Sequence, residues 1–290
     1  MGSRRVSIRG WRVAWSEYAK WLRNPRMLIG GILVVVIYTL AVVPLLERAE
    51  KMGLPLNFWE PMVAVGNSGL LVLLLPSVFL VLQSDYPVIE ANSLMYLVRV
   101  GKRTWLLGQI LFSLVSIISY LGGVFIAVGI CVYSDAYFGF EWSESTRMYA
   151  LMFPNEYDSF VASLLPSNLY NQIPLGAAVF HTFILLLLYF FMLTMVMMLF
   201  FLINKQGVGL LAAYGFIMSG VLTCAVQADV MWFFPMANSI IWLHYTEILN
   251  TPVYPVWCSY LYFFCWIFIL ITANFMLVKK AQFECREMLH

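Results

Sequence analysis

Six long stretches of the chain contain no Asp, Glu, Lys or Arg, at residues 27–46, 62–83, 105–133, 174–203, 206–228 and 253–278. Each is long enough to cross the hydrocarbon core of a bilayer, about 30 Å thick, as a helix. Helices are required there because lipid offers the backbone no hydrogen-bond partners. With 62% apolar or aromatic residues and 11% charged residues, the chain cannot cover a soluble globule with polar surface. We therefore predict an all-α membrane protein with six transmembrane helices in one domain, residues 1–290.

The charged residues lie between these stretches, and their signs alternate along the chain. The segments 1–26, 84–104, 204–205 and 279–290 hold 14 of the 17 basic residues, and the segments 47–61, 134–173 and 229–252 hold 10 of the 15 acidic residues. Because basic residues remain on the cytoplasmic side, this pattern predicts cytoplasmic termini and external segments at 134–173 and 229–252. We expect a multi-pass protein of the inner (cytoplasmic) cell membrane.

The segment 1–26 has the pattern of an amphipathic helix. Its aromatic and apolar face carries Trp11, Trp15, Tyr18 and Leu22, and basic residues follow a similar spacing on the opposite side. A helix of this type lies in the membrane interface. We predict a cytoplasmic elbow helix, which can serve as a topology anchor alone or also contact a cytoplasmic partner.

The segment 84–104 predicts a short cytoplasmic helix that is unusually apolar. Leu94, Met95, Leu97 and Val98 would be exposed on it, which is unfavourable in water and favours a groove on another protein. The alternative is a helix that rests on the inner leaflet without a partner.

Several kinds of chemistry have no motif in this sequence. The spans lack the charged groups that ion-driven carriers use, and no G-x-x-x-x-G-K-[ST] loop or H-E-x-x-H helix occurs. The five cysteines never form C-x-x-C. We therefore expect no catalytic residues, no metal, no cofactor bound by this chain and no nucleic-acid partner.

Uncharged polar and flexible side chains within the spans are candidates for a substrate path. In membranes such residues more often tighten helix packing, so both interpretations remain open. The candidates are Tyr38, Thr39, Asn67, Ser68, Ser77 and Met218.

The chain resembles the permease subunits of type-2 ATP-binding-cassette (ABC) exporters. The resemblance covers nearly the whole chain, through the elbow, the six spans, the cytoplasmic helix and the external segment before the last span. Its local motif lies at Asp85, Glu90, Leu94, Arg99, Gly101, Lys102, Arg103, Trp105 and Gln109. The family often has Lys where this chain has Gln109, and the segment 134–173 is longer than in many members.

The resemblance implies that residues 84–104 form a coupling helix seated on a soluble ATPase subunit, which binds ATP and Mg. The implied coupling residues are Asp85, Tyr86, Glu90, Ser93, Leu94, Leu97, Arg99, Lys102 and Arg103. The working unit would contain two permeases, identical or paralogous, and two ATPases in the lipid bilayer. The implied cargo is hydrophobic or amphipathic, first a peptide such as a toxin, bacteriocin or antimicrobial peptide, and otherwise a drug or lipid.

Two other classes of function remain open on the sequence alone. A membrane scaffold or sensor would use the same cytoplasmic helix to dock a signalling partner. A lipid-processing enzyme would use external residues such as Glu156, Asp158, Asp229 or His244, although these are more simply explained as solvated external groups.

Overall fold

The computed structural model describes residues 2–87, 97–156, 159–246 and 252–283. The longer helices are α1 (Gly2–Leu22), α2 (Met27–Ile37), α3 (Val43–Met52), α4 (Glu60–Asn67), α5 (Gly69–Gln83), α7 (Lys102–Val132), α11 (Leu175–Leu202), α12 (Gln206–Ala225) and α14 (Val256–Lys280). The shorter elements are a π-helical turn η1 (Tyr38–Val42), β1 (Leu56–Asn57), β2 (Ala136–Tyr137), α8 (Glu144–Met152), η2 (Pro154–Glu156), α9 (Phe160–Leu164), α10 (Ser167–Tyr170), η3 (Asp229–Phe233), α13 (Pro235–Ser239) and η4 (Trp242–His244).

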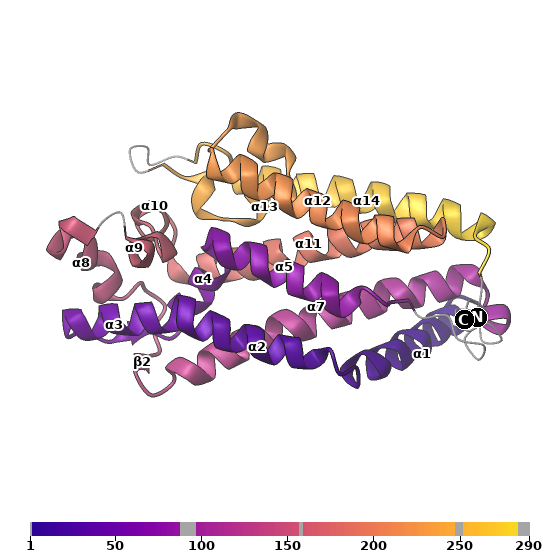
Figure 1. Cartoon of the computed structure of the whole chain (residues 1–290), viewed down its shortest axis with the longest axis horizontal. Helices are drawn as coiled ribbons and strands as arrows, with labels where there is room; N and C mark the ends of the chain where they lie inside the picture. Colours follow the sequence, from indigo (N-terminus) through magenta and orange to yellow (C-terminus); the bar gives the residue numbers. More distant parts are fainter. Residues whose placement is uncertain (1, 88–96, 157–158, 247–251, 284–290) are drawn as a thin grey trace.

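Five helical stretches are long and apolar enough to cross a membrane: Met27–Met52, α7, α11, α12 and α14. They run side by side along the long axis of the molecule (Figure 1). The core surrounds α11, whose apolar stretch is the most deeply buried of the five and which packs against α4, α7, α12 and α14. This architecture fits the predicted all-α membrane protein. Within the described residues, β-structure is confined to the two-residue parallel pair β1–β2, which joins Leu56 to Ala136.

The stretch 62–83, predicted as one unbroken span, is broken in the structure. Helices α4 and α5 meet at an angle of 79°, with Ser68 in an extended conformation between them. Gly66 lies so close to α11 that an added β-carbon would be 2.1 Å from the Thr182 methyl group. The run Gly66-Asn67-Ser68-Gly69 also has weak helix propensity. Counted as one span, the bent pair would give six, and that count remains a prediction.

Asn67 joins this break to the segment 229–246. Its buried amide oxygen accepts from the backbone N–H of Ile241 (2.9 Å), and its backbone carbonyl accepts from the Trp242 indole (2.9 Å). Its amide nitrogen donates to the Val63 carbonyl (2.8 Å). The Asn67 carbonyl at the bend is therefore satisfied by a segment that reaches back to it, and the Asn67 side chain bonds the same segment.

The first predicted span continues beyond residue 46 to Met52. The helix passes through η1, just before Pro44, whose missing N–H disturbs regular α-helical bonding, and ends at Gly53 with a left-handed φ of +63°. Glu47, Arg48, Glu50 and Lys51 therefore lie on α3, although we expected them in a loop. Similarly, α7 begins at Lys102, three residues before the predicted span.

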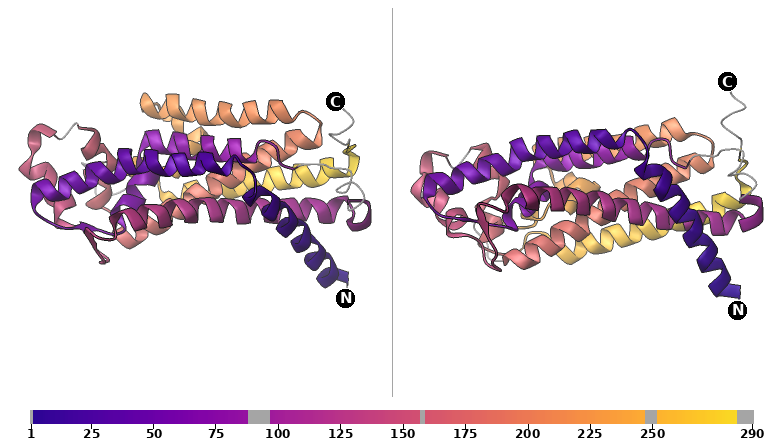
Figure 2. Two further views of the ribbon diagram at one scale, coloured as in Figure 1. Left: turned by 60° about the horizontal axis from the view of Figure 1, so that its bottom comes forward. Right: turned by 90° about the horizontal axis from the view of Figure 1, so that it is seen from below.

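Helix α1 crosses α7 obliquely (Figure 2). The backbones approach closely at Gly108, where an added β-carbon would lie 2.5 Å from the Val13 β-carbon. Trp21, almost fully buried, packs edge-on against Phe112 with ring centroids 6.5 Å apart. Residues Gly2–Leu22 of this segment are thus helical, and an elbow helix in the membrane interface remains a prediction.

Helix α1 and the C-terminal end of α14 lie at one end of the bundle, and α8, α9 and α10 lie at the other (Figure 1). Following the predicted orientation, we call these the inner end and the outer end. The inner end includes residues 84–87, 97–104 and the turn at Lys205. The outer end includes residues 53–59, 134–156, 159–173 and 229–246.

Candidate functional site

The predicted coupling segment lies at the inner end, and its described part ends in an exposed helical turn at 97–100. Leu97, which we expected to be exposed, is instead buried as part of the hydrophobic core, whereas Val98 is 81% exposed, as predicted, and Arg99 is exposed. Gly101 ends the turn with a φ of +86°, and its N–H donates to the Leu97 carbonyl (2.8 Å). This turn leads directly into α7. The predicted residues Glu90, Ser93 and Leu94 lie outside the described residues.

The start of the segment is bonded to two other parts of the inner end. Arg26, between α1 and α2, makes an ion pair with Asp85 (2.6 Å) and donates to the Ser84 hydroxyl (2.7 Å). Gln206, at the start of α12, donates to the Ser84 carbonyl (2.7 Å). Ser84 is therefore bonded to both the α1–α2 joint and α12, and Asp85 to the joint alone.

The end of the segment is bonded to the last helix. The Lys102 ammonium donates to the Ala281 carbonyl (2.7 Å), just beyond α14, and lies 5.7 Å from the Phe283 ring centroid. Trp105 packs edge-on against the same ring at 5.1 Å. Arg103 is exposed. The segment is thus connected to the N-terminal and C-terminal parts of the chain.

Tyr86 does not lie on the surface, where a residue contacting a partner was expected. Its ring is buried and packs against Phe112 at a centroid distance of 5.4 Å, and burial raises the pKa of its hydroxyl. Trp21 of α1 packs against the same Phe112, so Tyr86 belongs to an aromatic cluster that joins α1 and α7. The spacing of the apolar residues in 84–104 gave no sign of this.

The predicted elbow residues separate into two environments. Trp11, Trp15 and Leu22 are exposed, as expected for side chains facing lipid. Tyr18 is half-buried, and its hydroxyl lies 2.7 Å from the Ser119 hydroxyl of α7. Sequence analysis missed a third face that packs on α7, made up of Val13, Ala14, Glu17 and Trp21. Its i, i+1, i+4, i+8 spacing is the signal that identifies it.

The six candidate path residues are not brought together. Tyr38, Thr39 and Met218 are exposed on η1 and α12, and the Thr39 hydroxyl donates to the Val35 carbonyl (2.6 Å). Asn67 and Ser68 are buried at the break, and the Ser77 hydroxyl donates to the Leu73 carbonyl (2.7 Å). Thr39 and Ser77 are hydrogen-bonded within their own helices, and Asn67 is bonded to the segment 229–246. The role of the six residues in a substrate path remains a prediction.

An apolar groove of about 690 Å³ opens on the side of the bundle between α4, α7 and α11. Its floor includes Gly129, where an added β-carbon would lie 2.7 Å from the Phe58 ring. Gly129 therefore allows the Phe58 ring to pack directly against α7. The lining consists of Phe58, Trp59, Met62, Gly122, Phe125, Ile126, Gly129, Ile130, Tyr133, Val179, Phe180 and Phe183.

The outer end contains two buried charged residues, Glu60 and Arg48, which sequence analysis placed only in the segment 47–61 between two spans. Glu60 is fully buried and accepts from the Ser143 N–H (2.6 Å), the Ser143 hydroxyl (2.8 Å) and the Thr146 hydroxyl (3.0 Å). Arg48 is 3% exposed and donates to the carbonyls of Ser145 (3.3 Å) and Thr146 (2.5 Å). These bonds hold the first turn of α8 against α3 and α4. No pattern in the sequence pairs residues so far apart.

The two predicted external segments also join each other at the outer end. Asn168 donates to the carbonyls of Trp242 (3.0 Å) and Tyr245 (2.8 Å), and Gln172 donates to the Thr246 carbonyl. His244 is buried, with its ring nitrogens facing the Ile240 carbonyl (3.1 Å) and the Ser259 hydroxyl (2.8 Å). Burial lowers the pKa of His244 to about 4, which its carbonyl contacts oppose.

The residues proposed for a lipid-processing enzyme are not assembled into one site. Glu156 forms an ion pair with Lys51 and accepts from the Tyr149 hydroxyl, and these bonds lower the pKa of its carboxyl. His244 instead packs against Trp232, and Asp158 lies outside the described residues. Among the described residues, no three His, Cys, Asp or Glu side chains are grouped so as to hold a metal ion.

No protein-family model matches this chain, and neither a curated protein nor a solved structure matches it.

Proposed function

We propose that this chain is the membrane subunit of an ATP-driven exporter, and that a separate soluble ATPase supplies its energy. The observation that carries the proposal is the bonding of the inner-end segment. Its start is bonded to the α1–α2 joint and to α12, its end is bonded beyond α14, and between them Val98 and Arg99 are exposed. A partner that binds this turn could therefore displace several helices together.

In this proposal the membrane surrounds six spans, with α4 and α5 together forming the second. The inner end faces the cytoplasm, and the exposed aromatic face of α1 lies in the interface. Two copies of this chain, or one copy and a paralogue, act with two ATPases that bind ATP and Mg. The membrane is the inner membrane of the cell.

The proposed cargo is hydrophobic or amphipathic, first a peptide and otherwise a drug or lipid. The side groove supports this class because an apolar hollow that opens between helices suits a cargo entering from lipid rather than an ion or sugar. Cargo binding and ATP binding would then bias the same helices toward different access states.

The test is to purify the full chain from its natural membrane together with the proteins bound to it, and to measure ATP hydrolysis by the purified complex. We expect a P-loop ATPase to copurify, with hydrolysis falling at least several-fold in Arg99→Ala and Arg103→Ala. Arg147→Ala is the matched control, because Arg147 is equally exposed but lies at the outer end. A kinase or regulator in place of the ATPase would favour the scaffold or sensor, and unchanged hydrolysis in both variants would contradict the coupling site.

A further inference from the structure

Helix α1 has three faces, and two of them are not used for packing on the bundle. The face already described packs on α7 through Val13, Ala14 and Trp21. The second face is an exposed apolar stripe and the third is an exposed basic stripe. In both views of Figure 2, the N-terminal part of α1 projects past the side of the bundle. The two exposed stripes can therefore contact a molecule outside the chain.

The apolar stripe consists of Ile8, Trp11 and Trp15, which are each between 52% and 59% exposed. Separations of three and four residues place these side chains on one side of α1, one turn above the other. Large apolar side chains that remain exposed together are unfavourable in water. On a helix of this type, the acyl chains at the membrane interface are the environment that covers them.

The basic stripe near it consists of Arg9 and Arg12, which are both exposed and lie one turn apart. At 3.6 residues per turn, its centre lies about 100° around the helix from the centre of the apolar stripe. The single acidic residue of α1, Glu17, is buried on the side that packs against α7. The exposed part of this helix is therefore positively charged.

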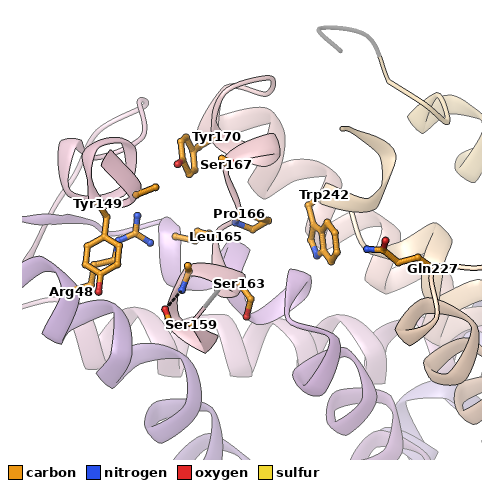
Figure 3. Close-up of a pocket in the computed structure, with 12 residues that line it drawn as sticks. Arg48, Tyr149, Ser159, Ser163, Leu165, Pro166, Ser167, Tyr170, Gln227 and Trp242 are labelled. Atoms are coloured by element: carbon orange, nitrogen blue, oxygen red, sulfur yellow. Dashed lines mark hydrogen bonds between the residues drawn. The ribbon is translucent and has the colours of Figure 1, made fainter. Parts of the chain in front are cut away.

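These two arginines differ from Arg48 at the outer end. Arg48 is 3% exposed, and its guanidinium donates to two backbone carbonyls of α8 and lies 4.5 Å from the Tyr149 ring centroid. Figure 3 shows it beside that ring, in the wall of a cavity of about 410 Å³. Its charge is used within the chain. The charges of Arg9 and Arg12 face outward, where an anionic group can reach them.

We propose that α1 binds an anionic phospholipid of the inner leaflet, with the phosphate on Arg9 and Arg12 and the acyl chains against Ile8, Trp11 and Trp15. An acidic protein surface would match the arginines but would leave the two indole rings without an apolar neighbour. A zwitterionic phospholipid would cover the apolar stripe but carries no net negative charge. This site requires neither an ATPase nor a cargo, so it goes beyond the proposed function.

The experiment is native mass spectrometry of the purified full chain in a non-ionic detergent, titrated with dioleoyl phosphatidylglycerol or dioleoyl phosphatidylcholine. The two lipids have the same acyl chains and both contain a phosphate, but only the first has a net negative charge. We expect the first molecule of phosphatidylglycerol to bind at least about tenfold more tightly than the first molecule of phosphatidylcholine. Equal affinities would overturn the proposal.

A pair of double variants locates the headgroup. Arg9→Gln with Arg12→Gln should reduce the preference for phosphatidylglycerol to less than about twofold. Arg99→Gln with Arg103→Gln removes two exposed arginines from the same end of the molecule and should keep the preference. An equal loss in this control would show that the overall charge of the inner end selects the lipid, and it would overturn the assignment to α1.

A further double variant tests the apolar stripe. Trp11→Asn with Trp15→Asn keeps both arginines and should weaken the binding of each lipid at least about fivefold, because the acyl chains lose their apolar contacts. Both side chains are exposed, so the variant should fold as the wild type does. Unchanged affinities would show that the lipid does not lie against this stripe, which would overturn the proposed site.

Discussion

Arg48 and Glu60 at the outer end are buried in a network, whereas Arg26 and Asp85 at the inner end form an ion pair near the surface. Arg48 and Glu60 have at most 3% of their surface exposed and are held by bonds to α8. Arg26 and Asp85 form their ion pair with side chains that are 39% and 28% exposed. Buried charges resist rearrangement because separating them from their partners is costly, and exposed pairs exchange readily with water. The Arg48–Glu60 network is thus suited to hold a fixed shape, and the Arg26–Asp85 pair is suited to rearrange.

The largest effect should come from breaking the outer network. Glu60→Leu leaves the Ser143 and Thr146 donors and the Arg48 charge uncompensated, which should cost about 3–5 kcal/mol of stability. Thermal unfolding of the purified protein in detergent measures this. The control is Glu141→Leu, because Glu141 is an exposed acidic residue at the same end. Equal melting temperatures for the two variants would contradict the distinction between the ends.

The effect of pH on stability through His244 at the outer end should be nearly as large as that of Glu60→Leu. His244 has a pKa of about 4 in the folded protein, below the ordinary value of 6.5, so the unfolded chain binds the proton more readily. Stability is then complete above pH 6.5 and falls as the pH drops toward 4, by about 2 kcal/mol at pH 5. Melting temperatures at pH 7.5 and 5 should differ less in His244→Asn than in the wild type. Equal differences would show that His244 is not the group responsible.

Packing between α1 and α7 should show an intermediate effect. Gly108→Leu places a side chain where even an added β-carbon would lie 2.5 Å from the Val13 β-carbon, so it should cost about 1–3 kcal/mol and loosen α1. Limited proteolysis near Pro25 reports the loosening. Gly123→Leu on the same helix is the control, because an added β-carbon there meets nothing within 4 Å. Equal protease resistance in the two variants would argue against the α1–α7 contact.

The smallest effect on stability should come from the inner-end pair. Arg26→Gln removes a partly exposed ion pair and should cost less than about 1 kcal/mol. If the proposed coupling is right, the same variant should still lower ATP hydrolysis by the copurified complex several-fold. Measuring thermal stability and ATP hydrolysis on one sample separates a loss of coupling from a loss of folding. A loss of stability as large as that of Glu60→Leu would remove the contrast between the ends.

The sequence predicted the helices well and their interruptions poorly. Hydrophobic runs located the long helices, because period and length are local properties. The bend at Ser68 depends on contacts with Thr182 and Trp242, more than a hundred residues away, so it has no local signal beyond the Gly-Asn-Ser-Gly run. The extension of the first helix to Met52 was missed because a run of charged residues is typical of a loop, and the sequence alone does not show which of them are buried.

The candidate sites show the same division. Exposure of Trp11, Trp15, Val98 and Arg99 agrees with the sequence pattern, since amphipathic spacing determines which side faces outward. The burial of Tyr86 and of Arg48 was not foreseen, because each depends on tertiary partners. Residues predicted from type alone, such as Asn67, lie in structural hydrogen bonds.

The most direct test of the account is cross-linking from the exposed inner-end turn. Val98→Cys, labelled with a photoreactive group in the intact complex, should form a covalent adduct with a P-loop ATPase. The same label at Val230, exposed at the outer end, should not. The account predicts an ATPase adduct at position 98 that Arg99→Ala diminishes. Adducts with lipid alone, or with a protein that binds no ATP, would contradict it.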